Sequence, residues 1–84
     1  MTRETIRTAL VDNLRTVVRN VPADVSDTNS LVDDFGADSL QVVEVVSRTM
    51  RQLRIRLRRT ELSKAKNIGD LVGLFEAAAT AKVA

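Results

Sequence analysis

Residues 33–40, Asp-Asp-Phe-Gly-Ala-Asp-Ser-Leu, decide the fold, because they join an acidic loop to the first turn of an amphipathic helix. Asp38 suits the N-cap position, since a short carboxylate accepts hydrogen bonds from the free amides of a first helical turn. At about 100° per residue, the apolar side chains of residues 39–53 fall on one arc. We therefore expect a helix from Ser39 whose core face contains Val42, Val43, Val45, Val46, Thr49, Met50 and Leu53. Leu40 is the exception, because it projects among polar side chains right beside Ser39.

The segment before this helix contains a second helical pattern and a long loop. One buried stripe of a helix is indicated by Ile6, Leu10, Leu14, Val17 and Val18. This helix is expected from Arg3 to about Arg19, with Thr2 as its N-cap and Asn20 at its end. Residues 21–38 are rich in turn-forming residues and make a long connection for so small a domain. We expect this loop to be ordered, with a helical turn at residues 30–32, because it can be pinned to the core by Val25, Leu31, Val32 and Phe35.

Arginine and apolar residues alternate over residues 54–59, a pattern that alone favours a half-buried strand. Because a single strand has nothing to pair with here, we interpret this segment as an extended linker that buries Ile55 and Leu57. A short helix from Thr60 to about Lys64 follows it.

The last helix is expected to begin at Asn67, whose cap pairs with Asp70 three residues later. Residues 81–84 are expected to fray, as chain ends commonly do. The buried face of this helix is predicted to contain Ile68, Leu71, Val72, Phe75 and Ala79. The fold class is therefore all-α, a four-helix bundle of three main helices plus one short helix, with a long loop between the first two.

Length and composition restrict the function classes. The 84 residues fit a single domain, residues 1–84, with one modest core. The chain has no Cys and no His, which removes disulfides, thiolate sites and the commonest metal ligand and general base. No apolar run approaches the roughly 20 residues that cross a bilayer, and residues 1–4 lack the apolar start of a secretion signal. We expect a cytoplasmic protein with no membrane association.

Charge is distributed unevenly although the net value is only +2. Residues 21–38 contain five Asp and no basic residue, whereas residues 39–59 contain six Arg and one acid, Glu44. This pattern predicts an electrically two-sided molecule.

The segment Gly-Ala-Asp-Ser-Leu, residues 36–40, behind an acidic loop and before an amphipathic helix, resembles the signature of the acyl carrier protein family. The resemblance extends to the chain length, the long loop and the order of the helices. It implies a bundle of acyl carrier type in which Ser39 is esterified with 4′-phosphopantetheine by a phosphopantetheinyl transferase. It also implies that Asp38 helps the transferase to hold its metal and substrate. Gly36 would permit a tight approach to the helix start, where a phosphodiester lies in a favourable dipole field.

The resemblance further implies a non-catalytic monomer that binds no metal of its own. Its arm would be loaded by an acyltransferase or ligase and unloaded by a ketosynthase or other acyl-accepting enzyme. Independent catalysis is disfavoured, because Ser39 has no histidine to activate it.

The chain departs from the family where many members present an acidic second helix to basic partners. Here Glu44 is followed by Arg48 and Arg51, and Arg58 and Arg59 stand where a proline and an acid are common. We expect partner enzymes to contact Asp38, Leu40, Glu44, Arg48, Arg58 and Arg59 through apolar contacts or acidic patches. An equally open interpretation is that the arginines are a solvated face and that Glu44 and Arg48 only support their helix.

The Gly-Ala-Asp-Ser-Leu motif is more similar to the acyl than to the peptidyl branch of carriers. It favours a free-standing carrier for polyketide synthesis in bacterial secondary metabolism, such as antibiotic biosynthesis. An aminoacyl or peptidyl carrier is the alternative. A small helical DNA-binding protein is a remote alternative suggested by the Arg-rich run, but the five aspartates before the expected recognition helix would repel phosphate. We therefore expect no nucleic-acid partner.

Overall fold

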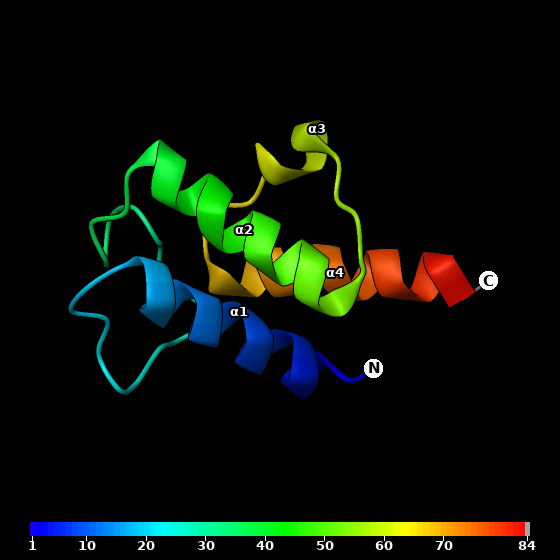
Figure 1. Cartoon of the computed structure of the whole chain (residues 1–84), viewed down its shortest axis with the longest axis horizontal. Helices are drawn as coiled ribbons and strands as arrows, with labels where there is room; N and C mark the ends of the chain where they lie inside the picture. The colour runs from blue at the N-terminus through cyan, green and yellow to red at the C-terminus, as the bar shows by residue number, and fades with distance from the viewer. Residues whose placement is uncertain (84) are drawn as a thin grey trace.

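The computed structural model describes residues 1–83, and four α-helices make up the regular structure of this part of the chain. They are α1 (Arg3–Val17), α2 (Ser39–Leu53), α3 (Arg59–Leu62) and α4 (Ile68–Val83). Figure 1 shows α4 running along the long axis of the molecule, α1 and α2 lying side by side and both inclined to that axis, and the short α3 set to one side. The start of α1 and the end of α4 lie at the same end of the molecule (Figure 1). The predicted all-α bundle with three main helices and one short helix is confirmed.

Helix α1 has the predicted start and ends slightly earlier than predicted. The Thr2 side chain accepts a hydrogen bond from the amide of Thr5, as an N-cap does. The helix stops at Val17, two residues before the expected end, and Asn20 adopts a left-handed conformation with φ 65°. Asparagine tolerates this conformation, so Asn20 still marks the point where the chain turns away. The buried stripe is wider than expected, because Ala9 and Val11 are also buried.

Helix α2 has the predicted bounds, but one part of its predicted core face was wrong. Val45, Val46 and Thr49 are buried, and Val42, Met50 and Leu53 are partly buried against the core. Val43 is 61% exposed instead of buried. The predicted core face of seven residues was too wide, because Val43 lies at its edge and does not pack against the rest of the bundle.

The long loop is held to the bundle by a partly different set of apolar side chains from the one expected. Val25 and Leu31 are buried and Phe35 is partly buried, whereas Val32 is 53% exposed, so its predicted role as a core anchor was wrong. Ala37, at 2% exposure, takes part in the core instead. The expected helical turn appears as a run of turns over residues 31–35, in which the amide of Asp34 donates to the carbonyl of Ser30.

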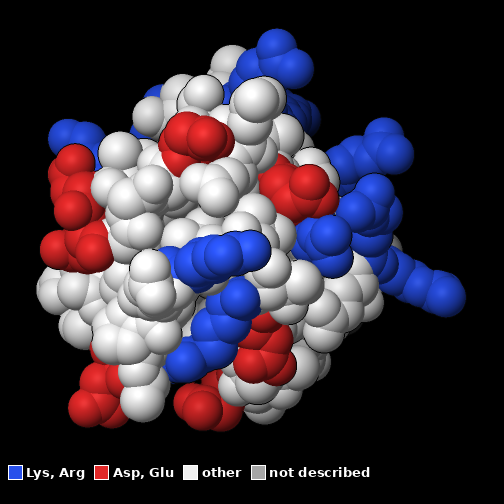
Figure 2. All heavy atoms as spheres, turned by 60° about the vertical axis from the view of Figure 1, so that its left-hand side comes forward, with Lys and Arg blue, Asp and Glu red and all other residues white. Residues whose placement is uncertain are grey.

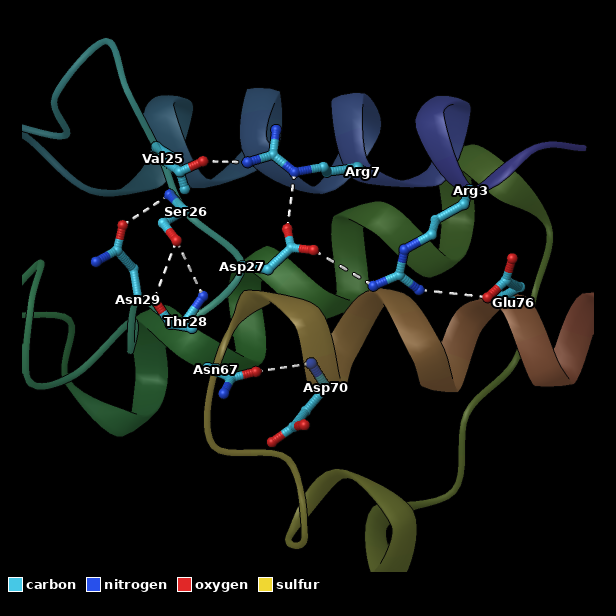
Figure 3. A network of polar contacts seen from close by, with 10 residues as sticks. All are labelled: Arg3, Arg7, Val25, Ser26, Asp27, Thr28, Asn29, Asn67, Asp70 and Glu76. Atoms are coloured by element: carbon cyan, nitrogen blue, oxygen red, sulfur yellow. Dashed lines mark hydrogen bonds and ion pairs between the residues drawn. The ribbon is translucent and has the colours of Figure 1, made fainter.

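A polar network supplies the rest of the loop's attachment (Figure 3). Asp27 accepts hydrogen bonds from Arg7 at 2.9 Å and from Arg3 at 3.4 Å, and Arg3 also pairs with Glu76 of α4 at 3.3 Å. Arg7 donates in addition to the carbonyl of Val25. The hydrogen bond from Arg7, supported by that from Arg3, lowers the pKa of Asp27 below its usual value of 3.8, although partial desolvation opposes this shift. The loop is thereby tied to α1 and α4 together.

The C-terminal half follows the predicted order with shifted boundaries. Ile55 and Leu57 are buried in an extended linker, as expected. Helix α3 begins at Arg59, one residue before the predicted start, and ends at Leu62, two residues before the predicted end. It starts early because the Glu61 carboxylate accepts a hydrogen bond from the amide of Arg58, which caps the first turn.

Helix α4 has the predicted cap, since the Asn67 side chain accepts a hydrogen bond from the amide of Asp70 at 2.8 Å. Four of its predicted core residues are buried, namely Ile68, Leu71, Val72 and Phe75, and Ala79 is partly buried. The expected fraying was wrong for residues 81–83, because the helix continues to Val83; Ala84 lies outside the described residues. Within residues 1–83, no helix is both long and apolar enough to cross a membrane.

Candidate functional site

Ser39 is the first residue of α2 and is exposed to solvent. No hydrogen bond within residues 1–83 holds its hydroxyl in place. The peptide dipoles of a helix concentrate partial positive charge at its N-terminus, so an oxygen there is well placed to bear an anionic group. The predicted attachment residue is therefore reachable, and its position suits a phosphate ester.

Asp38 fixes the start of α2 as predicted. Its carboxylate accepts a hydrogen bond from the amide of Gln41 at 2.8 Å, and the Gln41 side chain accepts one from the amide of Asp38 at 3.0 Å. This reciprocal pair satisfies two backbone donors that the helix itself cannot satisfy. The Asp38 side chain thus defines the orientation of the turn that carries Ser39.

The loop immediately before the site is closed by backbone hydrogen bonds. The amides of Gly36 and Ala37 donate to the carbonyls of Val32 and Leu31, both at 3.0 Å. Gly36 has φ +70°, a conformation that side chains rarely adopt, and a Cβ there would meet no atom within 4 Å. The expectation that Gly36 permits a tight approach was therefore wrong. A glycine is favoured at position 36 because the backbone there is left-handed as the chain turns into α2.

A hollow of about 760 Å³ opens beside Ser39, between α2 and the segment containing α3. Apolar side chains dominate its walls: Leu31, Val32, Val42, Val43, Val46, Met50, Leu57, Leu62, Ala65 and Leu71. Arg59 and Lys66 also line this hollow. A chain attached at Ser39 would thus find an apolar groove alongside its point of attachment.

Three exposed apolar side chains surround the site. Leu40 is 79% exposed, which confirms the predicted projection, while Val43 and Val32 are 61% and 53% exposed. The contribution of Val43 was missed from the sequence, although its position three residues after Leu40 places both on one side of a helix. Val32 had no comparable signal, because its exposure depends on how the loop turns. We call Val32, Leu40 and Val43 the apolar rim.

The charged residues expected to meet partners do not form one group. Glu44 and Arg48 form an ion pair of 3.1 Å on the exposed side of α2. Arg59 lies beside the hollow that contains Ser39, whereas Arg58 lines a different hollow next to Ala77 and Ala78 of α4.

The two-sided charge distribution is only partly visible. Figure 2 shows basic side chains gathered along one edge of the face that it presents. Acidic side chains are scattered over the rest of this face, including its upper part and the border of the basic edge, with basic ones among them (Figure 2). One reason is that Asp27 of the acidic loop lies against two arginines of α1.

This arrangement can hold a group but has no means of activating it. Ser39 has no neighbouring base, since the chain contains no His and the Asp38 carboxylate is engaged with the amide of Gln41. A hydroxyl without a base is a poor nucleophile, so the proton must be removed by another protein. The site is consistent with a point of covalent attachment that another enzyme acts on.

Comparisons with known proteins agree with this geometry. Residues 4–75 match the family described as phosphopantetheine attachment site. The chain is 33% identical over 73 residues to an acyl carrier protein of Brachyspira hyodysenteriae, covering 81% of this chain and 94% of that protein. It is 36% identical over 72 residues to an acyl carrier protein of Wolinella succinogenes, covering 81% and 95%. A meromycolate extension acyl carrier protein of Mycolicibacterium smegmatis is 28% identical over 75 residues, with 89% and 76% covered.

A solved structure has the same fold. It is described as the HMG synthase of the curacin biosynthetic pathway in complex with an acetyl donor acyl carrier protein. The matching chain has a TM-score of 0.79 and 29% sequence identity, with 92% of this chain and 99% of that chain covered. Together with the family match over residues 4–75, these likenesses show that the chain belongs to the acyl carrier protein family, whose members carry phosphopantetheine and are acted on by other enzymes rather than being catalysts themselves.

Proposed function

We propose that the Ser39 hydroxyl bears the 4′-phosphopantetheine arm and that residues 1–84 act as one carrier domain. The observation that carries this proposal is the exposed hydroxyl at the first residue of α2, held in orientation by the Asp38 cap. The matched family residues, 4–75, include this position.

The modification is a phosphoryl transfer from coenzyme A. The Ser39 oxygen forms a new bond to the phosphorus of the phosphopantetheine, the pyrophosphate bond of coenzyme A breaks, and adenosine 3′,5′-bisphosphate leaves. The serine proton passes to a base of the transferase, because this chain offers none. The resulting phosphodiester adds one negative charge at the N-terminus of α2, where the helix dipole favours it.

The cargo of this carrier is proposed to be an acyl intermediate of polyketide-type synthesis, held as a thioester on the arm. Two features support this choice. The Gly-Ala-Asp-Ser-Leu motif is of the acyl type, and a structural neighbour serves a dedicated biosynthetic pathway, that of curacin. The arginines that follow Glu44 on α2 and in the linker set this chain apart from carriers with an acidic recognition helix.

The attachment site is tested by incubating the purified chain with coenzyme A and a broad-specificity phosphopantetheinyl transferase, then weighing the intact protein. We expect the mass of one arm to be gained, and the gain to be absent in Ser39→Ala. Ser26→Ala is the matched control, because Ser26 is an exposed serine in the loop that precedes α2. A gain that persists in Ser39→Ala, or no gain in the unmodified chain, would overturn the assignment.

The class of cargo is tested with the modified protein. Malonyl and aminoacyl groups are offered through pathway acyltransferases and adenylating ligases, and the loaded fraction is measured by mass. We expect acyl loading and subsequent transfer to a polyketide ketosynthase. Efficient aminoacylation without malonyl loading would instead place the chain among aminoacyl or peptidyl carriers.

A further inference from the structure

A basic surface lies at the far end of α2 from Ser39, where the chain passes through the linker to α3. Figure 1 shows this linker beside the C-terminal half of α4. Helix α2 has 15 residues and spans about 21 Å at a rise of about 1.5 Å per residue, so this surface is remote from the candidate attachment site. We call its exposed arginines, Arg54, Arg56 and Arg58, the distal basic surface.

The three arginines of the distal basic surface line one hollow of about 700 Å³. Its other walls are formed by Ile55 and Glu61 and by small side chains of α4, namely Ala77, Ala78 and Ala81. Because alanine side chains project little, a bound polypeptide can bring its backbone close to α4 here. The hollow thus combines a charged wall with a wall that allows close approach.

Positive charge dominates this hollow. Glu61 is the single acid among its lining residues, and the Glu61 carboxylate already accepts a hydrogen bond from the amide of Arg58 at 3.3 Å. Within residues 1–83, the side chains of Arg56 and Arg58 form no ion pair, because all four ion pairs of this part of the chain involve other arginines. Two guanidinium groups are therefore available to an external anion.

The stability of the fold does not account for all of these cations. Arg54 is the C-cap of α2, where the helix dipole favours a positive charge. Arg56 stands in the extended linker between the buried side chains of Ile55 and Leu57, and its own side chain is exposed. Arg58 is the N-cap of α3, where a positive charge is unfavourable. A partner explains the cations at positions 56 and 58 better than the fold does.

The chemistry and spacing of the surface suit carboxylates. A guanidinium group presents its donors in a planar fork that matches a carboxylate, and all three cations are Arg rather than Lys. In an extended chain, side chains two residues apart lie about 7 Å apart on the same side. Arg56 and Arg58 have this relation in the linker, and an extended chain with an acid at every second residue has the same repeat.

We propose that the distal basic surface binds an acidic segment of a partner protein, in an extended conformation with carboxylates at alternate residues. The chain also contains 11 acidic residues, so a larger polyanion such as a nucleic acid or an anionic membrane would meet repulsion that a short segment avoids. A partner anchored here leaves Ser39, at the other end of α2, free for a second protein. This inference goes beyond the proposed function and does not depend on the attachment at Ser39.

The test uses a synthetic peptide, Glu-Ala-Glu-Ala-Glu, blocked at both ends and titrated into the ¹⁵N-labelled chain at low salt. We expect saturable shifts of the backbone amide signals of residues 54–58 and 77–81 and none at residues 36–40. The neutral peptide Gln-Ala-Gln-Ala-Gln should cause no saturable shift. Added salt should weaken binding of the acidic peptide, because exposed ion pairs are screened.

Variants identify the groups responsible. Arg56→Gln combined with Arg58→Gln should raise the dissociation constant by about tenfold, as fits the loss of two exposed ion pairs. Arg15→Gln combined with Arg19→Gln makes the same change in net charge at exposed positions that do not line this hollow, and it should retain binding. Melting temperatures of the free variants report folding separately, and neither pair should lower them by more than a few degrees.

The outcomes separate this inference from its alternatives. The absence of saturable shifts with the acidic peptide, or equal weakening by both double variants, would overturn it. Tighter binding of a short DNA duplex or of phosphatidylserine vesicles at the same amides would overturn it in favour of a phosphate-bearing partner. A dimer in sedimentation that dissociates in the Arg56 and Arg58 double variant would assign the surface to a second copy instead. Ser39→Ala should bind the peptide as the unmodified chain does, so failure of the attachment is read separately.

Discussion

At the scale of single residues, substitutions can separate the cap formed by Asp38 from the role in recognition that we propose for it. Its carboxylate caps α2 by accepting from the amide of Gln41, and its negative charge lies one residue before Ser39. Asp38→Ala should lower the free energy of unfolding by about 1 kcal/mol, measured by urea denaturation, because the cap is lost. Asp38→Asn keeps a capping oxygen, so it should remain nearly as stable as the unmodified chain.

Loading distinguishes the second role of the same residue. If the Asp38 charge helps the transferase, Asp38→Asn should be modified more slowly than the unmodified chain although it is equally stable. The rate of mass gain at fixed transferase concentration measures this effect. Equal loading rates for the two proteins would show that Asp38 acts through its cap alone.

Leu40 is the residue for which stability and function should diverge most. Because its side chain is 79% exposed, Leu40→Ala should change the free energy of unfolding by less than about 0.5 kcal/mol. A partner that buries the apolar rim would lose contact area, so transfer of the acyl group to a ketosynthase should slow by about tenfold. This rate is measured by quenching the transfer reaction of the loaded protein at successive times. An unchanged rate would mean that Leu40 is an ordinary exposed apolar side chain.

At the scale of elements, hydrophobic periodicity predicted which helices form, and side-chain capping predicted where they begin. The starts of α1, α2 and α4 follow from Thr2, Asp38 and Asn67, whose side chains act locally and are visible in the sequence. The exposure of Val32 and Val43 was not predicted, because it depends on which neighbouring element covers each position. The early start of α3 likewise depends on a Glu61 contact to a backbone amide.

The long loop provides a test of an element that periodicity did not explain. Asp27 joins it to Arg3 and Arg7, while backbone amides of Ile68 and Gly69 donate to the carbonyls of Asn29 and Asp27. The pKa of Asp27 is lower in the folded chain than its usual 3.8, so the ionised carboxylate stabilises the fold above that pH. As pH falls through the lowered pKa, the carboxylate takes up a proton and this contribution is lost.

Acid unfolding of Asp27→Asn should therefore be less pH-dependent below about pH 4 than that of the unmodified chain. At neutral pH the variant should be less stable by only a fraction of a kcal/mol, because the Asp27 side chain is 46% exposed and its ion pairs are screened. Hydrogen exchange at the amides of Ile68 and Gly69 should be faster in this variant. Asp24→Asn, which alters an exposed acid of the same loop, is the control and should leave both measurements unchanged.

At the scale of the whole molecule, the sequence was enough to propose an attachment residue but not to predict its surroundings. Ser39 was proposed from five consecutive residues, whereas the hollow beside it is lined by residues from the loop, α2, the linker and the segment after α3. Lys66 shows the difference, because nothing near it in sequence connects it with Ser39. Charge along the chain was also a partial guide, since folding places Asp27 between two arginines.

Recognition by partners is a property of the whole charged surface. If the enzymes of this pathway present acidic patches, the association rate should fall when basic residues are reversed and when salt is added. We expect Arg48→Glu combined with Arg58→Glu to reduce kcat/KM for acyl transfer to a ketosynthase by about tenfold at low ionic strength, because two charge reversals each weaken long-range attraction.

Arg48→Glu also breaks the pair with Glu44 and places two acids four residues apart, at a cost of a few tenths of a kcal/mol. Arg15→Glu combined with Arg19→Glu, which makes the same change in net charge at two other exposed positions, controls for nonspecific effects. Equal rates for all three proteins would mean that these arginines form only a solvated face.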